Sequence, residues 1–160
     1  MNSSFRIGLG SDTHRLKEGL PLIIGGVEIP HSKGVIAHSD GDVLMHALVD
    51  AILGALGERD IGYHFPDNDP KWENAKSSLI LKKVVQWLSQ MQYKIANIDC
   101  TIHAEKPKLS DFIPRIRASI ARTLNLSESK INIKCKTGEN IGFIGKEEGI
   151  HAQAIILIYQ

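Results

Sequence analysis

Apolar and polar residues follow two periodicities along this chain. A period of two predicts strands at residues 5–10, 95–105, 131–136 and 149–159, and residues 20–30 resemble a hairpin that turns at Gly25-Gly26. A period of 3.6 predicts helices at residues 43–56, at 75–92 and after 108–110. This order predicts an α+β fold of two layers, in which three helices cover one face of a mixed four-stranded sheet, plus the small hairpin.

The helix predicted at residues 43–56 is apolar on almost every side, which is typical of a helix inside a protein. Ser39 is the predicted N-cap, with Asp42 at the third helical position. Asp42, His46 and Asp50 are four residues apart and therefore share one side of the helix. A buried histidine between two carboxylates is costly unless it binds something, although a core histidine with satisfied hydrogen bonds is the simpler alternative.

The composition indicates one domain over residues 1–160. With 160 residues, 42% hydrophobic residues and a net charge of +1, the chain can bury a core and has no basic surface typical of nucleic-acid binding. Residues 152–159 are too few to cross a bilayer, and residues 1–4 do not resemble a signal peptide. Cys100 and Cys135 lack metal-site spacing, so we expect buried free thiols and a cytoplasmic protein.

A second group of candidate ligands, Asp12 and His14, follows the first predicted strand. Asp12 and His14 point to the same face of an extended chain. Together with His46 they form a nitrogen and oxygen ligand set that suits Zn²⁺ with an open fourth position. Taken alone, the Asp-x-His pattern is frequent by chance and also fits a turn at the end of a strand.

These motifs together resemble one family. Asp12-Thr13-His14, the segment His38-Ser39-Asp40-Gly41-Asp42, and His46 are similar to the 2-C-methyl-D-erythritol 2,4-cyclodiphosphate synthases of the non-mevalonate isoprenoid pathway. The resemblance extends from Arg6 to Tyr159. It implies a homotrimer whose sheets pack around the axis, with active sites between subunits and Zn²⁺ on Asp12, His14 and His46. Asp42 and Asp50 are candidates to orient His46, and the sequence does not decide between them.

Residues 60–70 are rich in turn formers, and a loop of this length is usually functional, although a solvated connector is equally compatible. The corresponding family segment contacts substrate. The resemblance therefore assigns substrate binding to residues of this loop and to the residue after His38. These residues are Ser39, Asp60, Ile61, Gly62, Phe65, Pro66, Asp67 and Asp69.

Two further loops, 104–110 and 136–145, are able to bind an anion, but as generic patterns they also fit plain turns. In the family they line the cytidine diphosphate pocket. The resemblance assigns Glu139 to a Mg²⁺ or Mn²⁺ on the diphosphate, and it assigns hydrogen bonds to phosphate oxygens, a catalytic role, to Thr137 and His38. The other substrate-binding residues it assigns are Ala104, Pro107, Lys108, Leu109, Lys136, Phe143 and Lys146. Lys146 stands where the family usually has Arg, and Glu147 replaces the next Gly; Lys keeps the charge but loses the bidentate fork.

The implied reaction is an intramolecular phosphoryl transfer on a cytidine diphosphate derivative of 2-C-methyl-D-erythritol 2-phosphate, with release of CMP. Two alternatives remain from the residues themselves. One is a zinc-dependent phosphohydrolase, in which metal-bound water attacks the substrate. The other is a trimeric ligand-binding or regulatory protein with a structural zinc. The apolar helix and the doubly apolar end of residues 149–159 predict an oligomer in each case.

Overall fold

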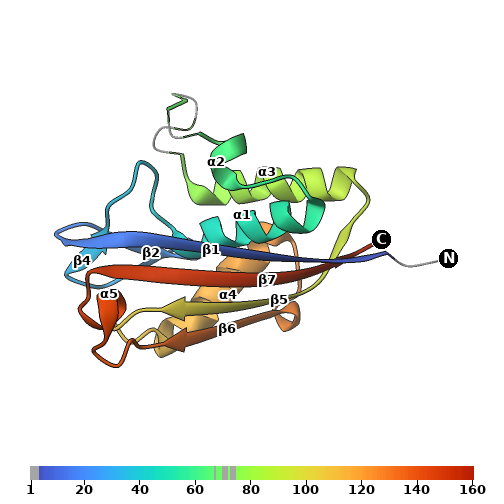
Figure 1. Cartoon of the computed structure of the whole chain (residues 1–160). Helices are drawn as coiled ribbons and strands as arrows, with labels where there is room; N and C mark the ends of the chain where they lie inside the picture. Colours follow the sequence, from blue (N-terminus) through green and yellow to red (C-terminus); the bar gives the residue numbers. More distant parts are fainter. Residues whose placement is uncertain (1–3, 67, 70–71, 73–74) are drawn as a thin grey trace.

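The computed structural model describes residues 4–66, 68–69, 72 and 75–160, and Figure 1 shows their arrangement. The long predicted helices are present as α1, α3 and α4, and the predicted strands and hairpin are present too. The elements are, in chain order, β1 (Phe5–Glu18), β2 (Leu22–Ile24), β3 (Val27–Ile29), β4 (Lys33–Val35), α1 (Val43–Leu56), α2 (Ile61–His64), α3 (Ser77–Gln90), β5 (Lys94–His103), η1 (Ser110–Phe112), α4 (Ile113–Leu124), η2 (Glu128–Lys130), β6 (Ile131–Lys136), α5 (Gly142–Gly145) and β7 (Gly149–Tyr159).

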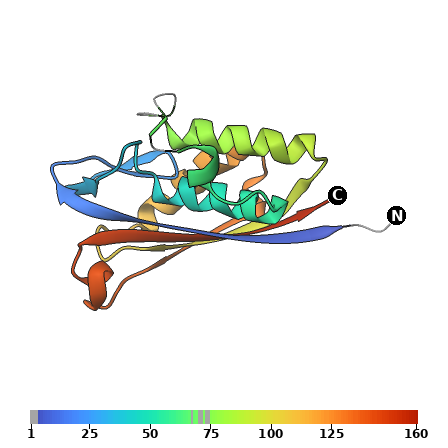
Figure 2. The same cartoon turned by 45° about the horizontal axis from the view of Figure 1, so that its top comes forward.

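The described residues form a five-stranded sheet in the order β4-β1-β7-β5-β6, with β2 and β3 as a separate hairpin. Only the β5–β6 pair in this sheet is parallel, so the sheet is mixed. In Figures 1 and 2, α1, α3 and α4 lie on the same side of it. The predicted α+β layout is therefore confirmed, but the count of four strands is wrong. The first strand continues to Glu18, and its extension pairs with β4 through Leu16 and Val35.

Helix α1 lies directly on β1 because two glycines leave room for its backbone. Gly8 and Gly10 are on the face of β1 that points toward the helix. A Cβ atom at Gly8 would lie 1.9 Å from the carbonyl oxygen of Ala51, and one at Gly10 would lie 2.0 Å from that of Ala47. Asp12 and His14 follow on the same face of the strand. The close contact therefore fixes the position of α1 relative to the side chains of Asp12 and His14.

The prediction that α1 is an interior helix is confirmed. The apolar side chains of α1 were expected to need a second subunit, but the same chain covers them. These side chains are buried against β1, β7 and α3. The predicted N-cap is wrong: α1 begins at Val43, and its N-cap is Asp42, whose carboxylate accepts a hydrogen bond from the backbone N–H of Met45 at 3.0 Å. The backbone turn at Gly41, with a φ of 67°, separates Ser39 from the helix.

The opposite face of the sheet carries exposed apolar side chains. Phe5, Ile7 and Leu9 on β1 are 63%, 69% and 65% exposed, and Ile155 on β7 is 44% exposed. Their alternating neighbours Gly8, Ile156 and Ile158 face the helices, with both isoleucines completely buried. A contiguous apolar area of this kind on one sheet face is typical of an interaction surface.

Three smaller predictions have mixed outcomes. Cys100 is a buried free thiol, but Cys135 is exposed because it lies near the end of the edge strand β6. The 60–70 loop includes the short helix α2, which the turn-rich sequence did not indicate. Within the part of the chain that the structure describes, every helix is too short or too polar to cross a bilayer.

The contact between α1 and β1 predicts opposite effects for two glycine-to-alanine changes. In Gly10→Ala the new Cβ meets backbone, so α1 must move, and we expect a loss of about 1–3 kcal/mol in the free energy of unfolding. Gly54→Ala is the control, because its Cβ would lie 3.7 Å from the nearest atom, and a helical alanine adds about 0.5–1 kcal/mol. Urea unfolding measures both, and equal stability of the two variants would contradict the packing described above.

Candidate metal centre and substrate cavity

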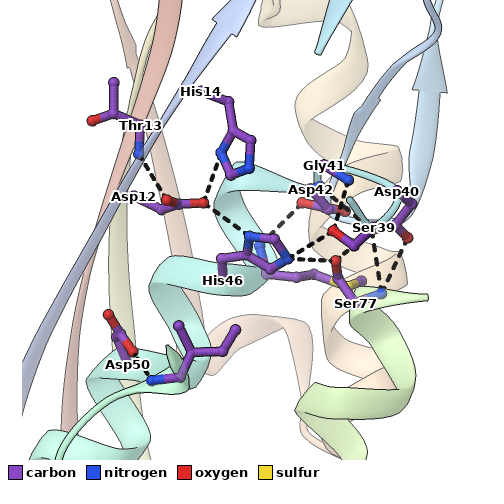
Figure 3. Close-up of polar contacts among 12 residues, drawn as sticks. Asp12, Thr13, His14, Ser39, Asp40, Gly41, Asp42, His46, Asp50 and Ser77 are labelled. Carbon is purple, nitrogen blue, oxygen red and sulfur yellow. Dashed lines mark hydrogen bonds and ion pairs between the residues drawn. The ribbon is translucent and has the colours of Figure 1, made fainter. Parts of the chain in front are cut away.

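Three side chains from β1 and α1 converge at the predicted metal site. The Asp12 Oδ2 atom lies 2.9 Å from Nδ1 of His14 and 2.9 Å from Nδ1 of His46. One ligand atom from each residue falls within 4.8 Å of the other two. Figure 3 shows the carboxylate between the two imidazole rings, whose centroids are 5.4 Å apart. The structure thus brings together the three residues that the sequence predicted as ligands.

The donor set fits a metal ion. Nδ1 of His14 is buried, and within the described residues it has no hydrogen bond of acceptable geometry, even though the Asp12 carboxylate is at ion-pair distance. A buried ring nitrogen without a satisfied hydrogen bond is a suitable ligand atom for a cation. Two imidazole nitrogens and one carboxylate oxygen are ligands that Zn²⁺ prefers, and three protein ligands leave a coordination position for substrate.

The electrostatics keep the carboxylate ionised. Burial raises the pKa of Asp12, but the neighbouring imidazoles of His14 and His46 outweigh burial and hold this pKa well below its usual range. Burial lowers the pKa of His46, and the Asp12 carboxylate, with the charges of Asp42 and Asp40, raises it above its usual value by more. The site therefore attracts positive charge, which is what a cation-binding cluster requires.

The structure gives Asp42 a different role from the predicted one. Its completely buried carboxylate accepts hydrogen bonds from the backbone N–H groups of Gly25 at 2.9 Å, Gly26 at 2.6 Å and Met45. Burial raises the pKa of Asp42 to about 6, because these three hydrogen bonds only partly offset desolvation. Asp42 thus joins the β2–β3 turn to α1, and its carboxylate is bound by backbone N–H groups.

Asp50 likewise acts elsewhere than at the ring of His46. Its carboxylate accepts a 2.7 Å hydrogen bond from the backbone N–H of Ile61, the first residue of α2. Burial raises the pKa of Asp50, and the hydrogen bond from Ile61 opposes this shift. Asp50 therefore connects the helix that carries His46 to the segment that was predicted to contact substrate.

A cavity of about 340 Å³ lies beside the three converging side chains. The cavity is lined by the three candidate ligands and by five of the residues predicted to bind substrate or phosphate: His38, Ser39, Ile61, Gly62 and Phe65. Asp60 instead caps α2 through the N–H of Tyr63, and Pro66 accepts a backbone hydrogen bond from Asp69 beyond α2. Asp67 lies outside the described residues.

Six of the predicted nucleotide-binding residues gather at a second cavity of about 170 Å³, between the ends of β5 and β6. The hydroxyl group of Thr137 donates a hydrogen bond to the carboxylate of Glu139. The backbone N–H of Gly138 is held by Glu105 at 2.8 Å, which fixes this turn. The predicted residues that line the cavity are Ala104, Pro107, Lys108, Leu109, Lys136 and Thr137.

Phe143 and Lys146 line a third cavity, of about 670 Å³. The substituted residue Glu147 also lines it, with a left-handed φ of 54° that glycine adopts more easily. Its carboxylate lies 3.1 Å from Nζ of Lys106 and 4.0 Å from Nζ of Lys33. The hydrogen bond from Lys106 holds the pKa of Glu147 below its usual range. Glu147 therefore neutralises part of the positive charge around this cavity.

Sequence reasoning missed three residues at or beside the first cavity. Asp40 and Ser77 form a hydrogen-bonded pair next to His46, and Trp72 lines the cavity wall. Asp40 lies inside the recognised segment 38–42, but Ser77 and Trp72 are far from it in sequence. No spacing pattern connects a lone serine at a helix start to a histidine 31 residues earlier.

An Asp-His-His cluster with an open side, next to a cavity in a two-layer α+β domain, is consistent with a metal-dependent enzyme. More specifically, the chain belongs to the YgbB family, whose match extends over residues 5–159. It is 53% identical to the 2-C-methyl-D-erythritol 2,4-cyclodiphosphate synthase of Geobacillus sp. (strain WCH70), over 96% of this chain and 98% of that relative.

Solved structures agree with this assignment. The bifunctional IspDF from Campylobacter jejuni matches 99% of this chain with 42% identity and a TM-score of 0.94, and this chain covers 43% of that protein. A structure of 2C-methyl-D-erythritol-2,4-cyclodiphosphate synthase in a CDP-bound form matches 96% of this chain and 99% of its own length, with 37% identity and a TM-score of 0.89. The similarity thus covers the whole fold.

The converging ligands predict a specific result for metal content. Purified wild-type protein should hold about one Zn²⁺ per chain, and His46→Ala should lose it because two of three ligands rarely retain the ion. His103→Ala is the control. The ring of His103, on β5, contacts the ring of His151 and none of the three ligands. Elemental analysis checks both variants, and unchanged zinc in His46→Ala would show that the ion binds elsewhere.

Proposed function

We propose that this protein is a 2-C-methyl-D-erythritol 2,4-cyclodiphosphate synthase. It converts 4-diphosphocytidyl-2-C-methyl-D-erythritol 2-phosphate to 2-C-methyl-D-erythritol 2,4-cyclodiphosphate and CMP. The observation that carries the proposal is the convergence of Asp12, His14 and His46 at a cavity lined by His38 and Ser39. Membership of the YgbB family and relatives of this name across nearly the full chain support it.

The reaction needs positioning more than covalent chemistry by the protein. An oxygen of the substrate 2-phosphate attacks the β-phosphorus and forms a new P–O bond. The bond between that phosphorus and the oxygen bridging to the α-phosphorus breaks, and CMP leaves with the electron pair. Because nucleophile and electrophile belong to one molecule, the protein must hold both phosphates in line and neutralise charge.

The residues of the first cavity suit this task. Asp12, His14 and His46 would hold Zn²⁺, which supplies Lewis-acid polarisation of a phosphate oxygen. His38 and Ser39 line the same cavity and would donate hydrogen bonds to phosphate oxygens. Asp50 accepts a hydrogen bond from the backbone N–H of Ile61, so the wall formed by α2 is fixed relative to the metal ligands.

The second cavity suits the cytidine diphosphate. Lys108 and Lys136 bring positive charge, and Thr137 offers a hydroxyl group for phosphate oxygens. Glu139 would hold a Mg²⁺ or Mn²⁺ that neutralises the diphosphate, a hard cation that suits a carboxylate. The structure of a relative in a CDP-bound form shows that a protein of this fold accommodates such a nucleotide.

The proposed assembly is a homotrimer with active sites between subunits. The two cavities are lined by separate sets of residues in one chain, so a substrate that needs both requires them to be brought together. The apolar face of the sheet around Ile7 and Leu9 supports an assembly in which this face is covered by neighbouring copies.

Product analysis tests the reaction. Incubation with the diphosphocytidyl substrate and Mg²⁺ should give the cyclic diphosphate and CMP, both identified by phosphorus NMR, and a chelator should abolish turnover. Release of inorganic phosphate or of a linear phosphorylated product would instead indicate the zinc-dependent phosphohydrolase. Absence of any turnover with zinc fully bound would favour the ligand-binding alternative.

The second cation predicts a selective defect in Glu139→Gln. This change removes a charged ligand, so charge on the CMP leaving group is less neutralised, at a cost of roughly 3 kcal/mol, or about a hundredfold in kcat. Zinc content should be unchanged, because Glu139 is not one of the three converging ligands. Glu128→Gln is the control, since Glu128 pairs with Arg117 on the surface. Turnover of Glu139→Gln equal to wild type at saturating Mg²⁺ would contradict the proposed role.

The exposed sheet face predicts which substitution disrupts the assembly. Ile7→Glu places a charge on the face that a neighbouring copy would cover, so sedimentation at micromolar concentration should show dissociation of the trimer. Leu79→Glu is the matched control, because Leu79 is 57% exposed on α3, on the other side of the molecule. A wild-type monomer, or equal behaviour of the two variants, would contradict the proposed interface.

A further inference from the structure

The ring of His46 is held on both of its nitrogens. Nδ1 faces the Asp12 carboxylate at 2.9 Å, and Nε2 lies 2.8 Å from the hydroxyl oxygen of Ser77. Ser39 is a more distant second neighbour of Nε2, at 3.5 Å. Figure 3 shows the ring between the carboxylate on one side and the two serines on the other. Ser77 is completely buried, which is unusual for a serine that does no more than begin a helix.

Asp40 determines what the Ser77 hydroxyl group can do. The Asp40 carboxylate accepts a hydrogen bond from this hydroxyl group, and both of its oxygens accept from the backbone N–H of Ser77, at 3.2 and 3.1 Å. An ionised carboxylate can only accept hydrogen bonds, so the hydroxyl proton is directed to Asp40. The remaining lone pairs of the Ser77 oxygen then face Nε2 of His46 and can only accept a proton from it.

This chain of hydrogen bonds fixes the protonation of the ring. Nε2 carries a hydrogen and donates it to Ser77, so Nδ1, which faces the Asp12 carboxylate, is the ring nitrogen left for a metal ion. This assignment follows from the hydrogen-bond partners, since hydrogens themselves are inferred. Metal-binding histidines generally donate their other N–H to a fixed acceptor, which sets the ring orientation and strengthens the ligand.

We propose that Ser77 and Asp40 are positioning residues that hold His46 with Nδ1 directed at the metal site. The proposal rests on the proposed function of Asp12, His14 and His46 as metal ligands. It also couples two elements, because Asp40 caps the start of α3 while Ser77, the first residue of that helix, holds a side chain on α1. The start of α3 thereby becomes part of the metal centre.

The first test measures zinc affinity of the metal-free protein by competition with a chromophoric chelator. Ser77→Ala should weaken binding by about 10–100-fold, as loss of such a partner typically does. Ser78→Ala, a change of the same kind at the next position of α3, should bind like wild type. Ser77→Thr retains the hydroxyl group and should recover most of the affinity. Equal affinities of Ser77→Ala and wild type would overturn the proposal and leave the metal site itself intact.

The second test separates positioning from a purely structural role. In the zinc-loaded protein, nitrogen-15 NMR should show a slowly exchanging proton on Nε2 of His46, retained in Ser78→Ala and lost to solvent exchange in Ser77→Ala. If Ser77 only stabilises α3, Ser77→Ala will unfold at lower urea but keep this signal and its zinc affinity, which would contradict the proposal.

The double variant tests whether the pair acts as a unit. Asp40→Ala combined with Ser77→Ala should reduce zinc affinity no more than Ser77→Ala alone, because groups in one hydrogen-bond chain are not additive. Two independent, additive losses would contradict the proposed chain. If the wild-type protein binds no zinc at all, the proposed function fails, and that result is distinguishable from any of these.

Discussion

The close contact of α1 with β1 is the constraint on which the rest of the site depends. Gly8 and Gly10 allow helix backbone to lie against strand backbone, at a distance that any side chain at these positions would prevent. Asp12 and His14 are the next two residues on the same face of the strand. His46 lies on the helix next to Ala47, which Gly10 contacts. The ligands therefore meet because two rigid elements are packed in a fixed arrangement, with Asp12 Oδ2 at 2.9 Å from Nδ1 of each histidine.

Three aspartates, on β1, at the N-cap of α1 and within α1, show how similar groups take separate roles. Asp12 is ionised between two imidazoles, Asp42 is buried as a helix cap, and Asp50 holds the start of α2. Asp50 matters for substrate because α2 forms one wall of the cavity. Aromatic packing supports the same wall. Phe65 is buried, its ring stacks on that of Trp87 with centroids 5.7 Å apart, and it meets the ring of Trp72 edge-on at 4.8 Å. Ligands and cavity wall thus belong to one packed unit.

Much of this arrangement could be predicted from the sequence, for identifiable reasons. Helical periodicity gave the bounds of α1, and the alternation of a strand correctly placed Asp12 and His14 on one face. The extension of β1 to Glu18 could not be read, because its pairing with β4 and β7 depends on residues distant in sequence. Side-chain partners were the least predictable. A spacing of four residues places Asp42 and Asp50 on the same side as His46, yet each carboxylate turns to a backbone N–H group that only the folded chain supplies.

The central claim is that this site joins two phosphates of one substrate and excludes attack by water. Turnover in water enriched in oxygen-18, followed by mass spectrometry of both products, tests it most directly. Intramolecular attack predicts that neither the cyclic diphosphate nor CMP contains oxygen from the solvent. Incorporation of one oxygen-18 atom per turnover into a phosphorylated product would show that water is the nucleophile and would contradict the account.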